Sequence, residues 1–298
     1  MQRTVVFIMG TSFSGSSLLN SLFDSQPNTR GLGEAVHLIH KPTNAWCGHC
    51  KCHVDQCQLQ KRICPDRFYE SVFDVYPESE VVVNSSKHWG QCFRSMPIPA
   101  SEFRLCLIIL SKSLEEFSHS FAVHQTCSFE NAFDVWSSFY QQLFANLDGV
   151  LTRVPKTDVQ QRLVSRMTDD SIAYVSYREL ATDTDATLGR LSDQLHLPFD
   201  SDYRNRLWGG DTCNIGGNNA IYAQRSGNAA FFQRDREYLN GKYCGRQGSI
   251  FYDDAWTQND QLRAAARRYR ESKQSDLESI ERRLRHLPQP KLATTLIR

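Results

Sequence analysis

The sequence has no long hydrophobic run and almost no excess of charge of either sign. No apolar stretch reaches the roughly 18 residues that a membrane-spanning helix needs. Its 34 lysines and arginines stand against 33 aspartates and glutamates, which excludes bulk electrostatic attraction to nucleic acid. The apolar residues near the start are too few for a secretory signal. We therefore expect a cytoplasmic protein, with neither nucleic acid nor a membrane as partner.

The chain of 298 residues, 40% of them hydrophobic, is long enough to bury a sizeable core. Continuous apolar runs predict buried strands at 5–9, 81–83, 105–110 and 172–177. Apolar residues at helical spacing predict helices at 18–23, 114–123, 131–147 and 187–195. Strands that alternate with helices indicate an α/β fold, with a central, mainly parallel β-sheet flanked by helices.

The last 40 residues differ in composition and predict one or two surface helices over 260–287. This stretch is rich in Arg, Glu, Gln and Ala, and Pro288 follows it. Its apolar residues form one stripe: Leu262, Tyr269, Leu277, Ile280 and Leu284. We expect a single α/β domain over 1–256 and a helical extension over 257–298 packed on the same domain. A homodimer contact through this stripe is the alternative.

A small, polar loop lies between the first predicted strand and the first predicted helix. Backbone N–H groups at a helix N-terminus lack partners and attract anions, and glycines let the backbone approach a phosphate closely. Gly10 and Gly15 have the spacing of a nucleoside-triphosphate loop, but Ser16 stands where that motif requires Lys. The pattern therefore predicts a nucleotide site other than that of a kinase or ATPase. Its candidate ligands are Thr11, Ser12, Phe13, Ser14, Gly15, Ser16 and Ser17.

This loop resembles the phosphosulfate loop of the sulfotransferases that use 3′-phosphoadenosine 5′-phosphosulfate (PAPS). Those proteins carry a basic residue before Ser-Gly-Ser/Thr-Ser/Thr, and Phe13 stands at the basic position here. Further segments resemble the family in its own order, over about residues 4 to 256: Pro27-Asn28, Gly33-Glu34, Val83–Lys87, Leu110–Leu114 with Ser120, Tyr177–Leu180, Gly217-Asn218 and Asp253–Trp256. The resemblance implies a P-loop-like α/β domain with PAPS as cofactor and adenosine 3′,5′-bisphosphate (PAP) as product.

The resemblance also implies roles for residues outside the loop. Lys112 and Ser120 match the segment that holds the 3′-phosphate. Tyr177 begins another segment that occurs in the same order along the chain in the family. Asn218 matches a residue near the adenosine, and Arg225 follows it as a second candidate cation. We expect these five residues to bind the cofactor.

Four side chains are candidates for the chemistry itself. Lys87 follows the apolar run at 81–83, and strand ends are where doubly wound sheets place their ligands. We expect it to supply positive charge at the reacting centre, since Phe13 carries none. Glu34 is the favoured general base by resemblance to tyrosylprotein sulfotransferases. His37 and His88 compete for that role, because a neutral imidazole accepts a proton near pH 7.

Five of the ten cysteines fall within the short stretch from about 46 to 64. We interpret this stretch as an insertion in the domain. A C-x-x-C pair on a turn can hold one corner of a zinc site. The candidate ligands of a structural zinc are Cys47, Cys50, Cys52 and Cys57. Local disulfides or free thiols remain alternatives.

The sequence thus predicts an enzyme that transfers a sulfuryl group from PAPS to a hydroxyl or amine of a small-molecule acceptor. A metabolite or a sugar is expected, because the near-zero net charge does not favour a polyanionic glycan. A nucleotide kinase with a P-loop and a non-catalytic nucleotide-binding protein are the alternatives.

Overall fold

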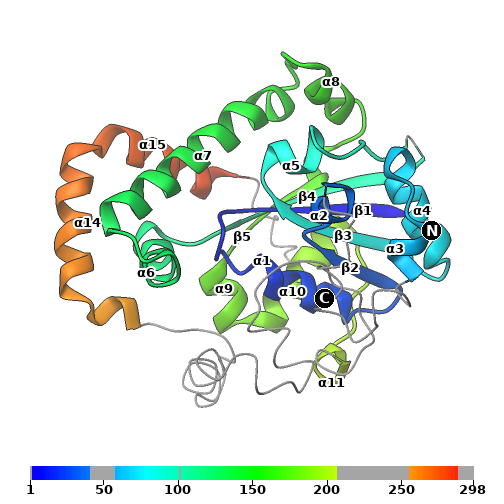
Figure 1. The fold of residues 1–298 in the computed structure, drawn as a ribbon, viewed down its shortest axis with the longest axis horizontal. Coiled ribbons are helices and arrows are strands. Elements are labelled where there is room, and N and C mark those ends of the chain that lie inside the picture. Colours follow the sequence, from blue (N-terminus) through cyan, green and yellow to red (C-terminus); the bar gives the residue numbers. More distant parts are fainter. Residues whose placement is uncertain (1, 41–57, 101, 207–254, 288–298) are drawn as a thin grey trace, which may run out of the picture.

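The central element of the protein is a five-stranded sheet in which every neighbouring pair of strands is parallel (Figure 1). The computed structural model describes residues 2–40, 58–100, 102–206 and 255–287. The strand order is β2-β3-β1-β4-β5. The strands are β1 (Thr4–Met9), β2 (Thr29–Gly33), β3 (Val81–Lys87), β4 (Arg104–Ser111) and β5 (Ile172–Ser176). The predicted α/β class with a parallel sheet is confirmed.

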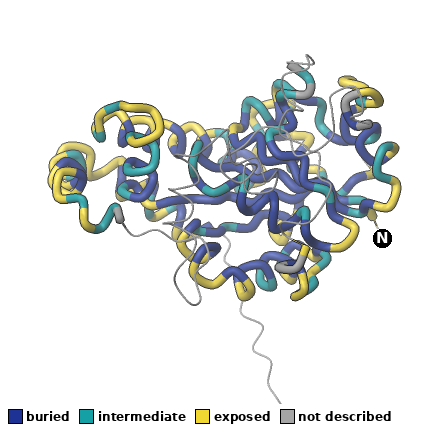
Figure 2. The backbone as a smooth tube through the Cα atoms, turned by 60° about the horizontal axis from the view of Figure 1, so that its bottom comes forward, coloured by how far each residue is buried: buried dark blue, intermediate teal, exposed yellow. Residues whose placement is uncertain are grey.

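Helices cover both faces of this sheet, because successive side chains of a buried strand point to opposite sides. In β1, Val5 and Phe7 join one apolar cluster, whereas Val6 and Ile8 join another. Figure 2 shows the strands buried and the exposed residues gathered on the outside of the molecule. The second cluster is closed by α1 (Ser16–Asp24), α9 (Tyr177–Thr182), α10 (Thr184–Leu195) and α11 (Tyr203–Arg206).

The helices of the other face are more numerous. They are α2 (Val36–His40), α3 (Gln58–Arg62), α4 (Phe68–Val75), α5 (Trp89–Phe93), α6 (Leu114–Gln125), α7 (Phe129–Leu151) and α8 (Asp158–Val164). The long helix α7 runs across this side of the molecule (Figure 1). Among the residues that the structure describes, no helix combines the length and apolar character needed to cross a membrane.

Two features of the sheet were absent from the prediction. The edge strand β2 has the sequence Thr-Arg-Gly-Leu-Gly. Because two of its five residues are glycines, it lacks the run of β-branched residues that indicates a strand. Strand β3 extends four residues beyond Val83, to Lys87, and its polar end is as buried as its apolar start. Lys87 is therefore the last residue of the strand instead of lying just past it.

The C-terminal stripe forms two helices, α14 (Asp260–Ser272) and α15 (Gln274–His286), at the end of the molecule where α6 and α7 lie (Figure 1). Leu262, Leu277 and Ile280 belong to the same apolar cluster as the side chains of α7. Arg283 pairs with Asp148 of α7. The helices thus pack on the sheet domain, while the division of the chain at residue 256 stays a prediction.

We expect Leu262→Ala to lower the free energy of unfolding by about 2–5 kcal/mol, because it removes a fully buried side chain from the core. Chemical denaturation measures the change. Gln261→Ala alters the exposed neighbour on the same helix and should stay within about 0.5 kcal/mol of the parent. An equally small change in both variants would show that α14 does not stabilise the domain.

Candidate active site

The candidate site lies at the carboxyl ends of β1, β3 and β4, which are neighbours in the sheet. In open parallel sheets, ligands bind outside these strand ends, where the chain connections diverge to opposite sides. The connections from β1 and β4 diverge in this way, since β2 and β3 lie on one side of β1 and β5 lies beyond β4. The loop after β1 and the residues after β4 therefore leave the sheet next to each other, at the same edge.

The loop from Gly10 to Ser17 is built as an open helix N-terminus. Gly15 is the N-cap of α1 with φ of 95° and no side-chain hydrogen bond caps the helix. A Cβ atom at this position would lie 2.3 Å from the ring of Tyr177, so both the backbone angle and the space require glycine. The first amide groups of α1 have no partner within the helix and can bind an anion.

One buried hydroxyl group of this loop lacks a hydrogen-bond partner among the described residues. It is Oγ of Ser14, which is 0% exposed, whereas the Thr11 hydroxyl interacts with the hydroxyl of Tyr140. Buried polar groups are normally paired, and an unpaired one costs about 1–3 kcal/mol. The loop therefore offers backbone amides and a buried hydroxyl that can bind an anion.

Phe13 takes the position of the family's basic residue and packs against α6. Its φ is 61°, in the left-handed region that a non-glycine residue rarely adopts. Its ring stacks on the imidazole of His124 with centroids 4.7 Å apart and planes 3° apart, and Phe121 meets its edge. The side chain thus ties the loop to α6 and brings no formal charge.

Three of the residues expected to bind the cofactor lie together: Lys112, Ser120 and Tyr177. The Nζ atom of Lys112 is 3.2 Å from Oγ of Ser120 and 4.2 Å from the centre of the Tyr177 ring. Lys112 is 6% exposed, so these contacts stabilise its positive charge in place of water. It also lines a groove of about 1070 Å³ with Ser176 and Arg178.

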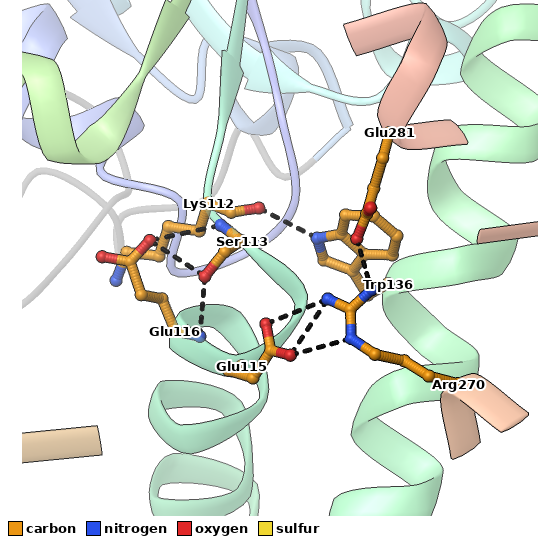
Figure 3. A network of polar contacts seen from close by, with 7 residues as sticks. All are labelled: Lys112, Ser113, Glu115, Glu116, Trp136, Arg270 and Glu281. Carbon is orange, nitrogen blue, oxygen red and sulfur yellow. Dashed lines mark hydrogen bonds and ion pairs between the residues drawn. The ribbon is translucent and has the colours of Figure 1, made fainter. Parts of the chain in front are cut away.

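A network of polar contacts fixes the backbone around Lys112 (Figure 3). The indole N–H of Trp136 donates to the carbonyl oxygen of Lys112 at 3.0 Å. Ser113 caps α6 in a reciprocal capping box with Glu116. The guanidinium of Arg270 then joins α14 to Glu115 of α6 and to Glu281 of α15, at 3.0 and 2.7 Å. The C-terminal helices are therefore bound to the start of α6, directly after Lys112.

The predicted catalytic residues Lys87, Glu34 and His37 form one chain of contacts. The ammonium of Lys87 pairs with Oε1 of Glu34, and Nε2 of His37 lies 3.3 Å from Oε2 of the same carboxylate. Lys87 has a φ of 67°, and the pairing of β1 with β3 shifts register beside it. Such backbone strain and strand irregularity are concentrated at functional sites.

A buried amide holds the polar end of β3 in place. Nδ2 of Asn84 donates to the Tyr69 hydroxyl at 2.8 Å and to the sulfur of Met96 at 3.3 Å. Its Oδ1 accepts from the backbone N–H and the hydroxyl of Ser86 at 2.9 and 2.6 Å. The hydroxyl oxygen of Ser86 accepts in turn from the N–H of Val36. This network joins β3 to the segment that carries Glu34, and the sequence prediction did not include it.

His88 follows Lys87 and lines a cavity of about 350 Å³ beside the loop. Burial and the nearby Lys87 charge lower the pKa of His88 below its usual 6.5, although Glu34 acts in the opposite direction. Its ring meets Phe139 of α7 edge to face at 5.2 Å. The cavity is completed by Thr11 and Ser12 of the loop and by residues of α7. A neutral imidazole thus faces the space next to the phosphate loop.

Other candidate residues lie outside the described part of the chain. These are Asn218, Arg225 and the cysteines Cys47, Cys50, Cys52 and Cys57. Within residues 2–40, 58–100, 102–206 and 255–287, no group of three or more His, Cys, Asp or Glu side chains could hold a metal ion. The structure therefore gives no support to a structural zinc.

Comparison with known proteins identifies the fold. No family model and no curated protein matches the sequence. Among solved structures, the sulfotransferase domain from the curacin biosynthetic pathway is 13% identical, with a TM-score of 0.51 over 89% of this chain and 97% of that one. This likeness shows that the chain has the sulfotransferase fold, as the resemblance of its motifs implied.

Two further sulfotransferase structures match at lower TM-scores. The domain from the Synechococcus PCC 7002 olefin synthase is 15% identical, with a TM-score of 0.46 over 83% of this chain and 97% of that one. Mouse sulfotransferase SULT7A1 complexed with PAP is 9% identical, with a TM-score of 0.45 over 96% of this chain and 89% of that one.

We expect NMR titration of the His88 ring to give a pKa below 6.5. Lys87→Met should raise this pKa, because it removes the positive charge that disfavours the imidazolium. Lys61→Met changes an exposed lysine of α3 and should leave the titration unchanged. A His88 pKa that stays the same in Lys87→Met would show that the Lys87 charge does not reach the ring.

Proposed function

We propose that this protein transfers the sulfuryl group of PAPS to a hydroxyl or amine of a small-molecule acceptor. The observation that carries the proposal is the open helix N-terminus at Gly15, with the buried, unpartnered hydroxyl of Ser14 beside it. Such groups are satisfied when an anion with several oxygen atoms occupies the loop. The sulfotransferase fold supports the choice of that anion.

The donor is held at two ends in this proposal. The amides and hydroxyls from Thr11 to Ser17 bind the phosphosulfate, and the helix dipole of α1 favours its negative charge. Lys112 and Ser120, already 3.2 Å apart, bind the 3′-phosphate. Since a lysine lacks the two-pronged geometry of the arginine that is usual in the family, it acts here as a point charge. Tyr177 packs between the loop and Lys112 and keeps the two ends apart.

PAPS, when bound, supplies a sulfuryl group whose bond to the bridging oxygen breaks as the acceptor atom bonds to sulfur, with the electron pair leaving on PAP. Lys87 stabilises the negative charge that develops on the leaving side. Its partner Glu34 fixes the position of the ammonium, with the Asn84 network holding both segments. Phe13 closes the loop without contributing charge.

His88 is the residue that we propose as acceptor of the proton released by the substrate. Its lowered pKa keeps the ring neutral at pH 7, and the ring lines the cavity next to Thr11 and Ser12. Glu34 is the competing base, and its two carboxylate oxygens are engaged by Lys87 and His37. These contacts favour Glu34 as a positioning residue.

Calorimetry with PAP tests donor binding directly. We expect PAP to bind the parent protein about 10 to 100 times more tightly than adenosine 5′-monophosphate, because a charged hydrogen-bonded contact contributes about 1.5–3 kcal/mol. In Lys112→Ala this difference should shrink to a few-fold at most. Lys61→Ala serves as a control with a charge change on the exposed surface. If the parent protein does not bind PAP at millimolar concentration, the proposal is contradicted.

The pH profile of transfer from labelled PAPS tests the base. We expect kcat/KM to rise with pH through a pKa below 6.5 and then to level off, because neutral His88 is the active form. His88→Gln should lower kcat by about 100-fold or more and remove this acidic limb. His286→Gln, an exposed histidine of α15, should change neither. If Glu34→Gln abolishes transfer while His88→Gln retains it, the base is Glu34.

A further inference from the structure

The cavity beside the phosphate loop bears on which acceptor the protein uses, and this inference rests on the proposed function. Its volume of about 350 Å³ lies at the small end of the range for small-molecule sites. One wall consists of Thr11 and Ser12 of the loop and of His88, the proposed base. The opposite wall is one side of α7, from Asp134 to Gln142. A small acceptor bound there would lie between α7 and the proposed base.

The α7 wall carries a stripe of hydrogen-bonding groups. Asp134, Ser138 and Gln142 are four residues apart, which places them on the same face of the helix. All three are exposed, whereas Trp136 and Tyr140 of the same helix are buried in the core. The stripe thus offers a carboxylate, a hydroxyl and an amide, which together donate and accept hydrogen bonds.

An apolar surface lies beside this stripe. Phe139 and His88 meet edge to face, and Val135 adds an exposed aliphatic side chain. Sugars and cyclic polyols have apolar C–H faces as well as hydroxyl rims. A wall that alternates ring surface with hydrogen-bonding groups matches that chemistry better than it matches a flat aromatic ring alone.

The charged side chains that line the cavity distinguish between classes of acceptor. Among the described residues that line it, Asp134 is the acidic one and no lysine or arginine is present. The Tyr269 hydroxyl donates to Oδ1 of Asp134 at 2.7 Å, which holds the carboxylate in position. Burial and the hydrogen bond to Asp134 raise the pKa of Tyr269 to about 12. An anionic acceptor would meet repulsion without a compensating cation.

We infer that the acceptor is a small polyhydroxylated molecule, such as a sugar or cyclic polyol, that is uncharged or carries an amino group. The stripe of Asp134, Ser138 and Gln142 binds its hydroxyl or amino groups, and Asp134 selects against acids. Asp134 is a specificity-determining residue in this assignment. One acceptor hydroxyl or amine then faces His88 and the loop.

Transfer from labelled PAPS to four acceptors of related size tests this inference. The acceptors are glucosamine, glucose, glucuronic acid and 2-naphthol. We expect transfer to glucosamine and glucose, with kcat/KM at least tenfold lower for glucuronic acid and for naphthol. Asp134→Asn should raise KM for glucosamine about tenfold and reduce the discrimination against glucuronic acid, with kcat little changed. Gln141→Ala changes an exposed neighbour on α7 that does not line the cavity and should behave as the parent.

Calorimetry with PAP on each folded variant separates the two proposals. Failure of the parent to bind PAP overturns the proposed function. If PAP binds but naphthol or glucuronic acid is the preferred acceptor, or no sugar accepts the label, the acceptor class is wrong and the donor site stands. Unchanged discrimination in Asp134→Asn, with circular dichroism and PAP affinity equal to the parent, overturns the role of Asp134.

Discussion

The ion pair between Lys87 and Glu34 is the interaction on which the candidate site depends. It joins the last residue of β3 to the segment that follows β2, and both side chains are mostly buried. A charge in such a place is costly unless it is paired and hydrogen-bonded, so each group requires the other. The Asn84 network adds uncharged hydrogen bonds between the same two segments. The polar end of β3 is therefore rigid before any ligand arrives.

The sequence predicts the parts of the fold in which burial leaves a pattern. β1 and β4 are continuous apolar runs because both of their faces are covered, and α7 shows a clear helical period. β2 leaves no such pattern, since Gly31 is required by its close approach to Asn20 and Asp24 of α1 and Gly33 has a φ of 69°. The end of β3 was missed for a similar reason: its polar side chains are satisfied by distant partners that no local spacing reveals.

The same distinction applies to the candidate site. The loop after β1 and the group of Lys112, Ser120 and Tyr177 could be predicted, because motif order and strand ends bring them to one edge of the sheet. The cavity wall on α7 could not, since Asp134, Ser138 and Gln142 have the spacing of an ordinary solvated helix face. Only the tertiary fold shows that this face is opposite the phosphate loop.

The bridge from Arg270 to Glu115 and Glu281 has a consequence for the far end of the chain. It connects α14 and α15 to the first turn of α6, and Lys112 directly precedes Ser113, the N-cap of that helix. Whatever Lys112 holds is then linked energetically to the folding of the last two helices, because a ligand that binds only the ordered form favours that form. Amide protons of α14 and α15 would exchange with solvent more slowly as the concentration of such a ligand rises. The terminal helices, which line the same groove as Lys112, thus report whether that groove is occupied.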